Sequence, residues 1–215
     1  MSRSTDRRLR STARRAARLG WVALPLALAC ATPGADAPSF CPSDTTYRTA
    51  SSEAFAEQWC EDAEGRSHGP FLRTSPSGVE RARGRYDRDV TVGAWLLRFE
   101  SGHPFLFLYY DEHGREYGPV YEWYESGALN TYERHDADGL AEAVHFYEDG
   151  RRKAHVAFRG GWAHGLATQW YADGSLRAIC EVDHGRARHC DRYAQGERWD
   201  APATASASVP ASPAR

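Results

Sequence analysis

Aromatic residues recur at a fixed place ahead of a glycine along most of the chain, between residues 69 and 199. They stand three residues before the glycine in five copies: Phe99, Tyr124, Tyr147, Tyr171 and Tyr193, with Ser75 at this place in the first copy. The glycines follow one another at steps of 24, 25, 23, 24 and 22 residues and are Gly78, Gly102, Gly127, Gly150, Gly174 and Gly196. A period of this size is typical of a repeat protein, in which one small unit packs against its neighbours.

Each unit has the pattern of a β-hairpin. The position before the aromatic residue holds Trp123, Phe146 or Trp170 in three copies, and aromatic residues favour the half-buried face of a strand. Serine or aspartate followed by glycine supplies a residue that accepts positive φ where the chain reverses. About five to eight residues remain for each strand, a normal length, and no stretch shows a sustained helical period. We therefore expect an all-β fold, an elongated single-layer antiparallel meander of about six stacked hairpins.

Two of these units resemble a known family. The runs from Gly118 to Gly127 and from Gly165 to Gly174 look like the MORN-repeat variant found in many bacterial proteins, some of which are labelled antitoxin-like. The segment Trp59-Cys60, with the later run 68–71, looks like the opening of secreted members of that group. The resemblance covers roughly residues 59–199. It implies a twisted antiparallel sheet of successive hairpins and no catalytic residues to carry over.

The first 29 residues have the pattern of an export signal. An apolar run of 11 residues from Leu19 to Ala29 follows a segment with seven arginines and one acid. This run is too short for a membrane-spanning helix, which needs ~20 residues. The arginine pairs leave the twin-arginine export route open beside the general one.

Cys30 directly follows this apolar run, which ends Leu-Ala-Leu-Ala. A small residue before a cysteine at this place resembles a bacterial lipoprotein cleavage site, which implies that Cys30 is lipidated and begins the mature chain. Ordinary cleavage after Ala29 or Ala31 is the alternative, and it would release a soluble secreted protein. Alanine after the cysteine favours the outer membrane, so the expected address is an outer-membrane lipoprotein facing the periplasm or the surface.

The chain divides into five segments: a signal peptide (1–29), a tether (30–40), an N-terminal cap (41–68), the repeat domain (69–199) and a tail (200–215). The tail is almost wholly Ala, Ser, Pro and Thr, so it cannot bury enough apolar surface and is expected to be disordered. Without residues 1–29 the chain keeps 20 basic and 28 acidic residues, a net charge of −8. Nucleic acid is therefore not an expected partner. The expected partners are the membrane, through the lipid anchor, and another envelope protein.

Four further cysteines, Cys41, Cys60, Cys180 and Cys190, agree with an oxidising compartment. Cys180 and Cys190 are equidistant from Gly185, and residues equidistant from a hairpin turn face each other within disulfide reach. Cys41 and Cys60 are then expected to close the cap. A Cys/His metal site at His184, His189 and Cys190 is the alternative, although the spacing of metal-binding motifs is absent.

The sequence contains no pattern of an enzyme. Nine histidines are scattered through the repeats, and the cluster Asp111-Glu112-His113 is best interpreted as a solvated turn, because neighbours on a strand point to opposite faces. Nucleophile, phosphate-loop and dinucleotide motifs are absent from the sequence. We expect a protein without catalytic activity, cofactor or bound metal.

The aromatic residues are the candidate binding surface. At equivalent places in stacked hairpins they should line up across the sheet, and a single layer cannot bury both of its faces on itself. The candidates are Trp95, Tyr121, Trp123, Tyr124, Phe146, Tyr147, Trp170 and Tyr171. The alternative is that these rings form the protein's own core, closed by curvature of the sheet.

Two functions remain open. The first is a non-catalytic interaction or scaffold module of the cell envelope, which binds through the sheet. The second is an antitoxin or immunity-type protein that neutralises a partner toxin.

Overall fold

The structure, a computed structural model, describes residues 40–196. This part of the chain contains fourteen β-strands and no helix. The strands are β1 (Thr46–Ser51), β2 (Ala56–Glu61), β3 (Ser67–Thr74), β4 (Glu80–Asp87), β5 (Val90–Arg98), β6 (Pro104–Tyr110), β7 (Gly118–Trp123), β8 (Leu129–Asp136), β9 (Gly139–Phe146), β10 (Arg152–Arg159), β11 (Trp162–Ala163), β12 (Gly165–Trp170), β13 (Leu176–Asp183) and β14 (Arg186–Arg192).

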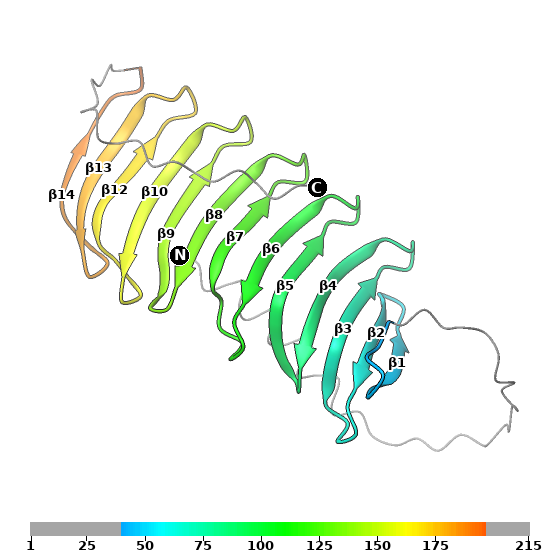
Figure 1. Ribbon diagram of the computed structural model, residues 1–215. Helices are drawn as coiled ribbons and strands as arrows, with labels where there is room; N and C mark the ends of the chain where they lie inside the picture. The colour runs from blue at the N-terminus through cyan, green and yellow to red at the C-terminus, as the bar shows by residue number, and fades with distance from the viewer. Residues whose placement is uncertain (1–39, 197–215) are drawn as a thin grey trace, which may run out of the picture. The chain divides into compact units, whose positions relative to one another are not determined.

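All of these strands belong to one open antiparallel sheet (Figure 1). Strands β1 to β10 and β12 to β14 lie side by side in chain order, and the two-residue β11 pairs with β10. Apart from β11 and the two edge strands, each strand therefore pairs with its two neighbours in this order, as a meander requires. The expected all-β, single-layer meander of hairpins is confirmed.

Glycine turns close the hairpins at one end of the sheet. Between β7 and β8, the N–H of Gly127 donates to the carbonyl of Tyr124 at 2.9 Å, and the N–H of Tyr124 donates to that of Ala128 at 2.8 Å. Gly127 has a φ of 88°, so the loop ends in a left-handed residue that glycine adopts without strain. The same pair of hydrogen bonds recurs at Gly78, Gly102, Gly150 and Gly174.

The last copy of the turn differs. Gly196 also has a positive φ, of 82°, but its N–H donates to the side-chain oxygen of Ser175 at 3.0 Å. The final aromatic of the pattern, Tyr193, donates its backbone N–H to the carbonyl of Arg177. The sheet therefore ends by fastening its last turn to the preceding hairpin.

Two rows of paired residues show which side chains share a face, because successive residues of a strand point to opposite faces. We call the side chains of one row the first face of the sheet. This row runs through Ala82, Leu97, Leu106, Glu122, Thr131 and His145. The neighbouring row runs through Arg83, Leu96, Phe107, Tyr121, Tyr132 and Val144, on the second face.

The core changes faces along the sheet. A first apolar cluster covers the first face over β3 to β7 and consists of Phe71, Ala82, Trp95, Leu106, Leu108 and Val120. A second apolar cluster covers the second face over β7 to β9 and consists of Tyr121, Trp123, Tyr132, Val144 and Phe146. The two meet at Val120 and Tyr121, which are adjacent in sequence and are both buried. Burial of each large side chain contributes about 1.5–3 kcal/mol, so both clusters are needed to hold one layer together.

Gly84 makes room for the largest ring of the first apolar cluster. A Cβ atom at this position would lie 2.1 Å from Cδ2 of Trp95, so any side chain there collides with the indole. The indole also packs against Phe71 and Tyr86, with ring centroids 5.6 and 5.1 Å away. Gly84 is therefore a packing requirement, unlike the turn glycines.

Two disulfides join the cysteines as expected. Cys180 and Cys190 are paired residues of β13 and β14, with Cα atoms 4.1 Å apart. Cys41 is bonded to Cys60 of β2, with a Cα separation of 5.6 Å, and Cys60 is almost completely buried. One bond thus fastens each end of the sheet.

Several expectations lie outside the described residues. They are the signal peptide (1–29), the lipidation of Cys30, all of the tether but residue 40, and the tail (200–215). Among residues 40–196, no helix has the length and apolar character needed to cross a membrane.

Candidate interaction surface

Four of the eight aromatic residues expected on a binding surface lie in the core instead. Trp95 keeps 6% of its surface exposed, Tyr121 4%, Trp123 8% and Phe146 7%. Rings from neighbouring strands cover one another, as Tyr121 and Tyr132 do with centroids 5.5 Å apart. A partner cannot contact these side chains in this fold, so the interpretation of the rings as the protein's own core applies to them.

Three of the other four form a tyrosine ladder, which consists of Tyr124, Tyr147 and Tyr171. Each is half-buried and donates its hydroxyl hydrogen to a backbone carbonyl of the next hairpin. The acceptors are Phe146 at 2.8 Å, Trp170 at 2.8 Å and Tyr193 at 3.2 Å. Each bond contributes about 0.5–1.5 kcal/mol and ties one turn to its neighbour. The ladder therefore has a structural role.

A polar patch lies on the first face over β7, β8 and β9, directly behind the second apolar cluster. It consists of Glu122, Thr131, Glu133 and His145. Glu122 pairs with Thr131, Thr131 with His145, and Glu133 is the next residue of β8 on the same face. Thr131 is buried, and its hydroxyl oxygen lies 3.2 Å from Nδ1 of His145.

The surroundings of the polar patch shift the pKa values of Glu122 and His145. Burial raises the pKa of Glu122, and the negative charge of Glu133 raises it further. Burial lowers the pKa of His145, although Glu133 opposes this effect. Half-buried carboxylates close together are costly without a counter-charge. Perturbed groups gathered on one surface are typical of a functional site.

His135 extends the polar patch along β8, away from the glycine turn that precedes this strand. Nε2 of His135 lies 3.2 Å from Oε2 of Glu133, and its Nδ1 lies 3.7 Å from Oε2 of Glu116. Its side chain is only 10% exposed. The carboxylate of Glu133 thus has a partner of its own, whereas Glu122 is held mainly by Thr131.

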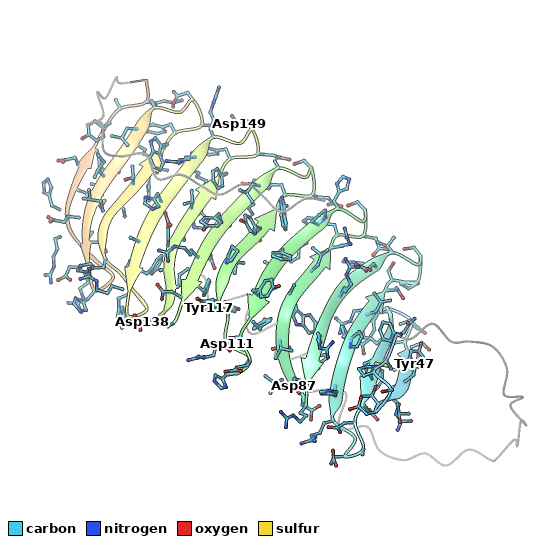
Figure 2. All side chains as sticks on the ribbon, viewed as in Figure 1. Tyr47, Asp87, Asp111, Tyr117, Asp138 and Asp149 are labelled. Atoms are coloured by element: carbon cyan, nitrogen blue, oxygen red, sulfur yellow. A yellow bond between two sulfur atoms is a disulfide. The ribbon has the colours of Figure 1, made fainter. Side chains whose placement is uncertain are left out.

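Among residues 40–196, the large apolar side chains that remain exposed lie at several places along the sheet. They are Tyr47 on β1, Tyr109 on β6, Tyr117 before β7, Trp162 on β11 and Leu166 on β12. Figure 2 shows Tyr47 and Tyr117 far apart along the sheet. They do not form one continuous stripe, so the polar patch is the better candidate surface.

The Asp111-Glu112-His113 segment forms the turn that the sequence indicated. Oδ1 of Asp111 accepts the backbone N–H groups of His113 and Arg115, each at 2.9 Å. The side chains of Glu112 and His113 point into solvent, with 87% and 67% of their surface exposed. The carboxylate of Asp111 therefore stabilises the backbone of the loop between β6 and β7 (Figure 2).

Sequence reasoning missed the polar patch. Its residues are adjacent in the chain to the aromatic residues of the expected binding surface. Glu122 lies between Tyr121 and Trp123, and His145 precedes Phe146. Because side chains alternate between faces, polar residues interleaved with buried rings must share the opposite face. This alternation of polar and aromatic residues could have identified the polar patch from the sequence.

Comparison with known proteins adds no relative: no family model matches the chain, and no curated protein matches it either.

Proposed function

We propose that this chain is a MORN-variant repeat lipoprotein of the bacterial cell envelope and acts as a non-catalytic interaction module. Cys30 is its lipid anchor, and the sheet of residues 46–192 is its binding part. The export pattern of residues 1–29 and the two disulfides support an oxidising location.

The polar patch is the observation that carries the proposal. Its two carboxylates lie on a sheet face, and the second apolar cluster holds their strands from behind. A lysine or arginine side chain of a partner would offset the repulsion between Glu122 and Glu133. The partner is therefore an envelope protein with a basic surface, which also suits the net charge of −8 that remains without residues 1–29.

Crosslinking in intact cells tests the binding part. Partners captured by wild type are quantified by mass spectrometry beside those captured by Glu122→Gln/Glu133→Gln. We expect the double variant to lose the main partner at least tenfold, and the exposed control Glu112→Gln to retain it. Equal capture by all three proteins would refute the role of the polar patch. Capture of a toxin encoded beside this gene would favour the immunity-type alternative.

Fatty-acid labelling tests the anchor separately. Cells grown with a labelled fatty acid should mark wild type and leave Cys30→Ser unmarked, because only the Cys30 thiol becomes the lipidated N-terminus. The same fractions should show wild type in membranes and the variant in the soluble fraction. Equal labelling of both proteins, or a wholly soluble wild type, would exclude lipidation at Cys30.

A further inference from the structure

Three side chains with metal-binding atoms meet at the end of the sheet opposite the glycine turns. His164 lies between β11 and β12, Asp183 ends β13, and His184 begins the turn to β14. Nδ1 of His184 lies 2.7 Å from Oδ1 of Asp183, and Nδ1 of His164 lies 3.4 Å from the same oxygen. One ligand atom from each residue falls within 4.8 Å of the other two.

These separations approach those of a metal centre. Bonds from zinc to imidazole nitrogen or carboxylate oxygen are ~2.0–2.2 Å long, which places neighbouring ligand atoms about 3–3.5 Å apart. The distance of 3.4 Å from His164 to Asp183 falls in that range, and the distance of 2.7 Å from His184 is shorter. The side chains of His164 and His184 are 37% and 76% exposed, so their rings are free to make the small rotations that close the remaining gap.

The backbone holds the three ligands together before any ion binds. The N–H of Gly185 donates to the carbonyl of Ala163 at 2.9 Å, which fixes the turn of His184 beside the segment of His164. The N–H of His164 in turn donates to the carbonyl of Ala157 on β10. The Cys180–Cys190 disulfide clamps the two strands that carry the turn. Ligands on rigid elements lose little entropy when they bind.

The backbone of His184 has a left-handed conformation. Its φ is 48°, and Gly185 follows at 76°, the pair of left-handed residues of a two-residue hairpin turn. Histidine is one of the non-glycine residues that accept this region, and Arg88 has the same φ of 48° in the turn between β4 and β5. The left-handed turn aims the imidazole at Asp183.

A second ion pair fixes the carboxylate. Nη2 of Arg188 lies 2.8 Å from Oδ2 of Asp183, the oxygen that does not face the histidines. Outer hydrogen bonds of this kind orient metal ligands and leave the other oxygen available.

We propose that His164, Asp183 and His184 bind one divalent first-row transition-metal ion, with Zn²⁺ as the ion to test first. Two imidazoles and one carboxylate suit zinc, copper, nickel or iron, whereas calcium and magnesium prefer oxygen ligands alone. Three protein ligands leave at least one coordination position open to solvent or to a partner's side chain. The site does not depend on the envelope location or on the polar patch.

The alternative Cys/His metal site at His184, His189 and Cys190 does not form. Cys190 is bonded to Cys180, and Nε2 of His189 lies 3.0 Å from Asp191. His189 is instead a matched control, because it is an exposed histidine beside an aspartate on the same hairpin but belongs to a pair rather than a trio. Substitution of His189 therefore measures how much metal binding comes from an isolated His–Asp pair.

Calorimetric titration with Zn²⁺ tests the proposal on the full chain. Every sample carries Cys30→Ser, so that no thiol of that residue contributes. We expect one ion per chain, at least tenfold weaker binding in Asp183→Asn and His164→Gln, and no change in His189→Asn. His184→Asn is the most informative variant, because asparagine accepts the left-handed backbone and removes only the imidazole ligand.

Co²⁺ absorption and thermal unfolding complete the test. Bound Co²⁺ should give a visible spectrum that His184→Asn abolishes, and Zn²⁺ should raise the melting temperature of wild type but not of that variant. A melting transition near that of wild type in the absence of metal shows that a variant is folded. Failure of wild type to bind Zn²⁺ at millimolar concentration, or equal losses in His184→Asn and His189→Asn, would overturn the site.

Discussion

At the scale of single residues, glycine is required in this sheet for two different physical reasons. Gly127 has a φ of 88° and ends a hairpin loop, where a side chain would clash with its own backbone. Gly84 lies inside a strand, and a side chain there would occupy the place of the Trp95 indole. The first requirement can be met by asparagine, which tolerates the left-handed region, whereas the second cannot.

The turn requirement is tested at Gly127. Gly127→Val should destabilise the protein by more than ~1 kcal/mol, because a β-branched residue is strained at positive φ. Gly127→Asn should cost much less. Thermal unfolding followed by circular dichroism measures both, and equal losses of melting temperature for valine and asparagine would contradict the requirement.

The packing requirement is tested at Gly84. Gly84→Ala should lower the free energy of unfolding by roughly 1–3 kcal/mol, the usual cost of forcing extra volume into a packed core. Combining it with Trp95→Phe should cost less than the sum of the two single changes, because a smaller ring leaves room for the methyl group. Additive losses in denaturant titrations would show that the two positions do not compete for space.

The polar patch predicts how stability depends on pH. Burial lowers the pKa of His145 below its ordinary 6.5 in the folded chain, so the unfolded chain binds the proton more readily. Stability contributed by neutral His145 is therefore present above pH 6.5 and is lost as the pH falls below it. The pKa of Glu122 is raised, so its contribution decreases as the pH rises above about 4.5.

Two variants separate these opposite slopes. The melting temperature of His145→Gln relative to wild type should increase as the pH falls below 6.5, and that of Glu122→Gln should increase as the pH rises above about 4.5. Melting curves between pH 4 and pH 8 give both differences. A constant offset between wild type and either variant across this range would mean that the group does not titrate as its burial requires.

At the scale of elements, the hairpins were predictable and their faces were not. The spacing from Gly78 to Gly174 predicted each turn, because a left-handed residue is needed wherever a hairpin closes in this way. The side that each strand buries depends on its neighbours, and Val120 and Tyr121 are buried on opposite sides. The rings of Trp95 and Tyr121 were therefore identified as important, while their burial could not be read from their spacing.

The terminal hairpins owe their attachment to covalent bonds. The burial pattern of β1 is exposed throughout, and that of β14 nearly so, so neither edge strand gains much from packing. The bond between Cys180 and Cys190 and the bond between Cys41 and Cys60 replace the neighbour that each edge lacks. This arrangement leads to a direct prediction about connectivity.

Peptide mapping without reduction should recover these two cysteine pairs from the purified chain. The Cys180–Cys190 peptide spans a register in which Glu181 also pairs with His189. Recovery of Cys60 joined to Cys180 would mean that the register of the last hairpin is wrong. Reduction should lower the melting temperature, with a stabilisation of roughly 2–4 kcal/mol lost for each bond.

At the scale of the whole sheet, sequence patterns could not predict which residues from separate strands come together. His164 and Asp183 meet because β12 pairs with β13 in the register that places Gly165 opposite Val182. One residue of slip would send one of them to the other face. The glycine and aromatic pattern describes one hairpin, whereas His164 and His184 lie in the connections before β12 and after β13.

The change of buried face within β7 has a consequence for how such a chain can grow by gene duplication. A hairpin copied from β3 to β6 carries apolar residues for the first face, and one copied from β7 to β9 carries them for the second. Each copy packs only when inserted among hairpins of its own kind. The glycine spacing is nearly the same in both, so it does not reveal which face a copied hairpin buries.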